Sequence, residues 1–86
     1  MAPTETLVFV KAGSEGQFLR HLRHAVGWSQ TETAKAAGMR QQDLSMLERD
    51  ELPLRWPSIQ RLYARVEAVL RQQLAERAAV TTEVAG

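Results

Sequence analysis

The chain has 86 residues, of which 44% are hydrophobic and 24% are charged, and its formal net charge is +1. This length and composition predict one small globular domain and argue against a disordered or strongly basic, nonspecific polyanion-binding protein. The chain contains no cysteine, so it has no disulfide or thiolate metal site, which fits a cytoplasmic location. No apolar run approaches the roughly 20 residues of a membrane span, so no membrane partner is expected.

A short apolar run near the N-terminus predicts a β-strand over residues 6–11. No second strand candidate follows, so such a strand needs a partner for its backbone groups, for example its own copy in a second subunit. A packed or disordered arm is the alternative, and residues 1–13 are therefore interpreted as an N-terminal arm or dimer strand. The run consists of Leu7, Val8, Phe9 and Val10.

The next segment predicts an amphipathic helix between Ser14 and Gly27. Ser14 and Gln17 have the spacing of a capping box, in which side chains satisfy the free backbone amides of the first turn. Glycine often ends a helix because it adopts positive φ without strain. Apolar residues at steps of three and four positions give this helix one inward face, formed by Phe18, Leu19, Leu22 and Val26.

Two short helices joined by a glycine turn follow. Ser29 and Glu32 repeat the capping-box spacing and predict a helix over residues 30–37. Gly38 supplies the positive φ of a tight turn, and the next helix is expected over residues 41–49. The residues expected to face inward from the two helices are Thr33, Ala34, Ala37, Leu44 and Leu47.

A longer helix is expected after a loop over residues 50–56. Pro57 suits its first position, where no amide hydrogen is needed. Helical periodicity then predicts a helix over residues 58–78, followed by a frayed tail over residues 81–86. The period is carried by Ile59, Leu62, Tyr63, Val66, Val69, Leu70 and Leu74.

Two short helices around a glycine turn form a helix-turn-helix arrangement. The stretch WSQTETAKAAGMRQQDLSMLER resembles the motif of the lambdoid phage repressor and Cro proteins, the XRE family, and the resemblance covers about residues 17–66. It implies a small all-α bundle of four or five helices, with residues 14–66 as the DNA-binding domain. The matched positions are Trp28, Ser29, Gln30, Glu32, Ala34, Gly38, Leu47 and Glu48, whereas Thr33, Arg40 and Asp50 depart from the pattern, the last replacing a usual glycine.

The start of the helix over residues 41–49 carries side chains suited to reading base pairs. A glutamine amide can donate to and accept from one adenine edge, and an arginine can grip guanine O6 and N7. The resemblance implies that the paired glutamines are base readers, whereas exposed residues without a ligand are the alternative. The expected base contacts are Arg40, Gln41, Gln42, Ser45 and Met46.

Other polar residues are expected to contact phosphate or to stabilise the fold. Helix N-termini favour anions, and the resemblance implies that the glutamine at the start of the second helix holds a phosphate. The resemblance also implies an ion pair between Arg23 and Glu48. The expected phosphate contacts are Gln30, Lys35 and Arg49.

No serine, cysteine, lysine or carboxylate has partners at catalytic spacing, so we expect neither an enzyme nor a cofactor. His21 and His24 stand three residues apart on one helix, but no third metal ligand is evident, so no metal site is expected.

A symmetric homodimer is expected because one recognition helix contacts only a few base pairs. The candidate interface comprises the arm residues named above and an extension over residues 67–80, with Val66, Val69, Leu70 and Leu74. The predicted function is that of a transcriptional repressor that binds a palindromic operator in double-stranded DNA, similar to the KorC-like repressors of broad-host-range plasmids. The alternative is an antitoxin-type interaction module that binds its own promoter and a toxin protein.

Overall fold

The computed structural model describes residues 14–85, and these residues contain four α-helices and no strand. The all-α prediction is therefore confirmed for this part of the chain, whereas the predicted N-terminal strand or arm lies outside the described residues. In chain order the helices are α2 (Glu15–Val26), α3 (Gln30–Ala37), α4 (Gln41–Glu48) and α5 (Pro57–Ala85).

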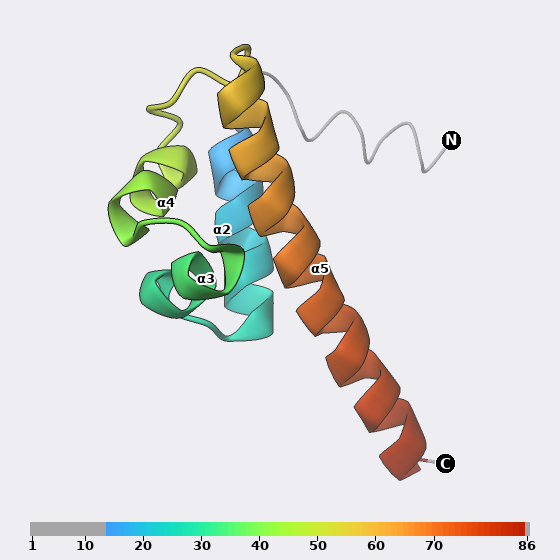
Figure 1. Ribbon diagram of the computed structural model, residues 1–86. Helices are drawn as coiled ribbons and strands as arrows, with labels where there is room; N and C mark the ends of the chain where they lie inside the picture. Colours follow the sequence, from blue (N-terminus) through green and yellow to red (C-terminus); the bar gives the residue numbers. More distant parts are fainter. Residues whose placement is uncertain (1–13, 86) are drawn as a thin grey trace, which may run out of the picture.

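The four helices form a small bundle with one projecting end (Figure 1). Helix α5 packs against α2 and α3, and α4 packs against α2 and α3 on the other side of the bundle. The later turns of α5 extend past the other three helices, as Figure 1 shows.

Glycines end α2 and α3, and a capping box begins α3. Gly27 and Gly38 end α2 and α3 in the left-handed conformation, with φ of 84° and 70°, as their positions predicted. At the start of α3, the Ser29 side chain accepts from the Glu32 amide at 3.1 Å, and the Ser29 amide donates to the Glu32 carboxylate at 2.8 Å. The capping box predicted for Ser14 is wrong, because its side chain makes no capping hydrogen bond and its backbone, with ψ of 9°, lacks the extended conformation of that motif.

Helix α5 begins at Pro57 as predicted but continues beyond the expected end at residue 78, to Ala85. Apolar periodicity fades after Leu74, yet no glycine or proline interrupts the chain between Pro57 and Ala85. The helix therefore continues where the packing pattern has already ended, and the tail expected to fray from residue 81 is helical through Ala85.

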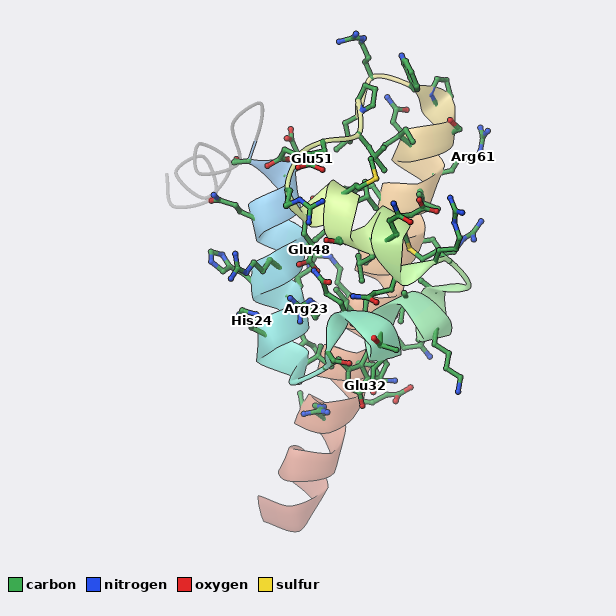
Figure 2. All side chains as sticks on the ribbon, turned by 90° about the vertical axis from the view of Figure 1, so that its left-hand side faces the viewer. Arg23, His24, Glu32, Glu48, Glu51 and Arg61 are labelled. Carbon is green, nitrogen blue, oxygen red and sulfur yellow. The ribbon has the colours of Figure 1, made fainter. Side chains whose placement is uncertain are left out.

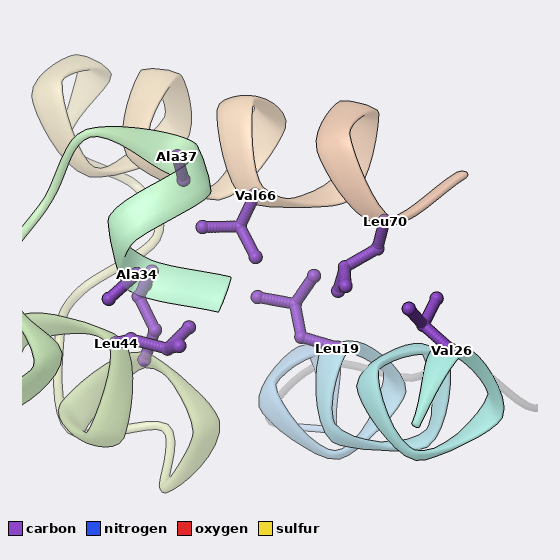
Figure 3. Close-up of a cluster of buried hydrophobic side chains, with 8 residues drawn as sticks. Leu19, Val26, Ala34, Ala37, Leu44, Val66 and Leu70 are labelled. Carbon is purple, nitrogen blue, oxygen red and sulfur yellow. The ribbon is translucent and has the colours of Figure 1, made fainter. Parts of the chain in front are cut away.

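Apolar residues from all four helices form one core (Figure 3). Val66 and Leu70 point from α5 toward Leu19 and Val26 of α2, and both are 0% exposed in the single chain. Their assignment to a dimer interface is therefore wrong, because α5 lies directly on α2 and uses this stripe for intramolecular packing. The buried residues of the core are Leu19, Val26, Ala34, Ala37, Leu44, Leu47, Val66 and Leu70.

Two hydrogen bonds join α5 to α2 and α3. The Tyr63 hydroxyl donates to the Glu15 carbonyl at 3.0 Å, at the first turn of α2. The Arg65 guanidinium donates to the Ala37 carbonyl at 3.4 Å, at the last turn of α3, where carbonyls lack partners within the helix. Helix α5 thus contacts the end of α3, directly before the turn to α4.

Within the described residues, no helix has an apolar stretch long enough to cross a bilayer.

Candidate nucleic-acid interface

Helix α4 has one buried face and one polar face. Leu44 and Leu47 are buried against the other helices, as the inward spacing predicted. The residues on the remaining surface at the start of the helix are therefore turned outward: Arg40, Gln41 and Gln42 are exposed, and Ser45 and Met46 are partly buried.

The turn between α3 and α4 is rigid because its backbone groups are paired. The Met39 amide donates to the Ala34 carbonyl at 2.9 Å, and the Gly38 amide donates to the Lys35 carbonyl at 3.2 Å. Thr33, which stands where the resemblance favours leucine, is fully buried, and its hydroxyl donates to the Ser29 carbonyl at 2.9 Å. Because this buried hydroxyl has a hydrogen-bond partner, the free-energy cost of burying an unpaired polar group does not arise.

This geometry, with two short helices joined at a left-handed glycine and a polar face on the second helix, is accompanied by a match to a known family. The model of the family described as a helix-turn-helix domain matches residues 16–80. The chain belongs to this family. No curated protein and no solved structure matches the chain.

A buried ion pair joins α2 to the end of α4 in this helix-turn-helix domain (Figure 2). The Arg23 guanidinium donates to the two Glu48 carboxylate oxygens at 2.7 and 3.1 Å, and also to the Trp28 carbonyl at 3.0 Å. The two side chains are only 11% and 4% exposed. Because each charge has lost its water, removal of either partner leaves an unpaired charge in the interior.

A chain of amide hydrogen bonds leads from this ion pair to the surface of the helix-turn-helix domain. The Gln30 side-chain nitrogen donates to a Glu48 oxygen at 3.1 Å. The Gln41 side-chain nitrogen in turn donates to the Gln30 oxygen at 3.2 Å. The residue expected to hold phosphate, Gln30, is thus in direct contact with a residue expected to read bases, Gln41.

The other base-reading candidates differ in how strongly they are held. Arg40 precedes α4, and its guanidinium donates to the Asp43 carboxylate in two contacts of 3.3 Å, although the Arg40 side chain is 79% exposed. Such an exposed pair contributes little stability and can exchange partners readily. Gln42 is exposed, and no other residue in the range 14–85 holds its side chain by a hydrogen bond.

Arg49, a phosphate candidate, follows α4 and is held by two neighbours. Its guanidinium donates to the Ser45 hydroxyl at 2.6 Å and to the Glu51 carboxylate at 2.9 and 3.0 Å. The hydrogen bond to Glu51 and its negative charge raise the pKa of Arg49, and the same hydrogen bond lowers the pKa of Glu51. Glu51 therefore competes with any phosphate for Arg49.

Beside α4 lies an open polar depression between α2, α3 and α4. Arg20, an exposed residue of α2, lines it together with residues already described, and nothing in its sequence neighbourhood indicated this position. Lys35 is exposed on α3. The side chains that line the depression are Arg20, Arg23, Gln30, Ser45, Glu48 and Arg49.

The remaining interface candidates lie away from α4. Val69 and Leu74 are partly buried on α5, packed against the core.

His21 and His24 are exposed on α2, and within residues 14–85 no three histidines or carboxylates lie close enough to share a metal ion.

Proposed function

We propose that this protein is a sequence-specific DNA-binding transcriptional repressor that inserts α4 into the major groove and blocks transcription by occupying its operator. The observation that carries the proposal is the exposed row of polar side chains at the start of α4. Hydrogen bonds through Gln30 link this row to the buried ion pair of Arg23 and Glu48. A major groove about 12 Å wide admits one α-helix, and its base edges differ in their donors and acceptors. Base readers must be exposed, and all three residues of this row are; Gln41 is also held in direction by its hydrogen bond to Gln30.

The roles proposed for the individual residues follow from their chemistry. Arg40, Gln41 and Gln42 read base edges, with Ser45 and Met46 contacting edges or a thymine methyl further along α4. Phosphates are held by Gln30, Lys35 and Arg49, together with the free amides at the start of α3. In this proposal Arg40 exchanges Asp43 for DNA, and Arg49 exchanges Glu51, since both pairs are exposed.

We further propose that the protein binds a palindromic operator as a homodimer. Two half-sites separated by about 34 Å double the number of contacted base pairs. Because Val66 and Leu70 are buried in the core, the remaining candidates for the dimer interface are Val69 and Leu74 on α5 and the apolar run over residues 7–10. A narrower form of the proposal, based on the resemblance alone, is a plasmid regulator similar to KorC.

Selection of bound sequences from a random pool of duplex DNA tests these proposals. A twofold-symmetric consensus with two conserved half-sites is expected, and that consensus placed over a promoter should lower reporter expression when the protein is present. Enrichment of no sequence above the starting pool would contradict the proposed function. A single, asymmetric half-site would contradict the palindromic operator while leaving DNA binding intact.

Gln42→Ala provides the residue-level check. It is expected to lower affinity by about 1–3 kcal/mol and to relax the preference at one base position. Lys35→Ala is the matched control, because the loss of a phosphate contact weakens binding to all sequences alike and reduces the salt dependence.

A further inference from the structure

We propose that Glu48, although buried, is a positioning residue that determines which base Gln41 reads. This inference rests on the proposed function and extends it to a residue that makes no DNA contact. It is carried by the chain of hydrogen bonds from Glu48 through Gln30 to Gln41.

The first step is the orientation of Gln30. The Glu48 carboxylate, paired with Arg23, offers only acceptors to its surroundings. The amide of Gln30 must therefore turn its nitrogen toward Glu48, at 3.1 Å, and its oxygen outward. The opposite orientation would place two oxygens against each other beside a buried carboxylate, where an unpaired acceptor is costly.

The second step is the orientation of Gln41. The outward oxygen of Gln30 accepts from the Gln41 nitrogen at 3.2 Å. This leaves the Gln41 oxygen, which has no partner among the described residues, and the second hydrogen of its nitrogen to face the groove. Gln41 therefore presents one acceptor and one donor in a fixed order.

That order matches adenine. Adenine N6 donates to the Gln41 oxygen while N7 accepts from the nitrogen, whereas guanine presents two acceptors, O6 and N7. Reading guanine would require the Gln41 amide to turn over, which breaks its hydrogen bond to Gln30. Glu48 thus favours adenine over guanine from a site inside the protein.

The decisive variant is Glu48→Gln. Arg23 would hold the oxygen of the new amide at position 48, so that its nitrogen faces Gln30. Gln30 then turns over, donates to the Gln41 oxygen, and leaves the Gln41 nitrogen to donate toward the groove. The variant should move the preference from adenine toward guanine at the position read by Gln41.

The experiment measures the affinity of the full chain for four duplexes that differ only at the position where Gln41→Ala relaxes the preference. Wild type should prefer adenine to guanine, and Glu48→Gln should lower that ratio by about tenfold. Arg23→Gln is the control: it breaks the same ion pair but keeps the Glu48 carboxylate, so the ratio should stay within about twofold of wild type.

Gln30→Leu keeps the test independent of folding, because it removes the link at a partly exposed site and leaves the ion pair in place. It should also lower the ratio of adenine to guanine affinity. If both Glu48→Gln and Gln30→Leu weaken all four duplexes equally, or if wild type prefers guanine there, the inference is overturned while the proposed function stands. A wild-type protein that distinguishes no sequences at all would instead overturn the proposed function.

Discussion

Asp50 and Gly16, 34 residues apart, are joined by a hydrogen bond of 2.9 Å from the Gly16 amide to the Asp50 carboxylate. The contact links the first turn of α2 to the loop that follows α4. Asp50 has positive φ, 59°, at a position where glycine is usual in the resembling family. The carboxylate thus supplies a partner for a free helix amide at a position where a side chain is otherwise unfavourable.

Replacement of Asp50 should separate these two effects. Asp50→Ala keeps the backbone strain and loses the hydrogen bond, so unfolding free energy should fall by about 1–2 kcal/mol. Asp50→Asn retains an acceptor and tolerates positive φ, so it should stay within about 0.5 kcal/mol of wild type. Urea denaturation followed by circular dichroism measures both, and a loss below about 0.5 kcal/mol for Asp50→Ala would show that the hydrogen bond contributes little.

Gly16→Ala should destabilise the fold because α2 and α4 approach each other closely there. A Cβ atom at Gly16 would overlap the carbonyl groups of Leu47 and Glu48, and neither backbone can move freely. The expected loss is about 1–3 kcal/mol, as for other overpacked sites. Gln17→Ala, on the exposed side of the same turn, is the control and should change the unfolding free energy by less than about 0.5 kcal/mol.

The buried pair should respond strongly to loss of one partner. Arg23→Met leaves the Glu48 carboxylate without its cation, and a loss of about 3–5 kcal/mol is expected in chemical denaturation. The double variant Arg23→Met with Glu48→Leu removes both charges and should recover much of that loss. A double variant no more stable than the single one would argue that the ion pair itself, rather than the unpaired charge, dominates.

Tyr63 makes the fold sensitive to alkaline pH. Desolvation on burial is the largest cause, followed by the negative charge of Glu67, and together with smaller contributions they raise the pKa of Tyr63 to about 12. Because the unfolded pKa is about 10, the stabilisation is fully present below pH 10 and is lost as pH rises toward 12. Tyr63 is the single tyrosine, so absorbance titration near 295 nm reports it alone. A midpoint near 10 in folded protein would contradict this prediction, and Tyr63→Phe should lack the additional loss of stability.

Substitutions of Leu70 and Leu74 should have different effects, although both residues belong to the apolar repeat of α5. Leu70 is fully buried, so Leu70→Ala should cost about 2–5 kcal/mol of unfolding free energy. Leu74 is only partly buried. We expect Leu74→Glu to keep the helical circular dichroism spectrum but to shift sedimentation from dimer to monomer and weaken operator binding. An unchanged dimer would exclude Leu74 from the interface.

Local signals in the sequence determined much of the helical framework. The left-handed glycines at positions 27 and 38, the capping box of Ser29 and Glu32, and the start of α5 at Pro57 follow from residue types that have few backbone alternatives. Apolar spacing also identified Leu44 and Leu47 as inward, and hence the opposite face of α4 as polar. These properties depend on neighbours within one or two turns, and so they can be read from the sequence.

Apart from the ion pair of Arg23 and Glu48, which the family resemblance implied, only the tertiary structure decided which distant residues meet. Periodicity identifies Val66 and Leu70 as apolar but cannot say whether α2 or a second subunit covers them, and the packing of α5 on α2 answers this. The hydrogen bond between Gln30 and Gln41 likewise depends on how α3 crosses α4, since no helical spacing relates the two residues. Burial and pairing of this kind arise from the arrangement of whole helices, because each contact requires two elements whose relative position no local pattern encodes.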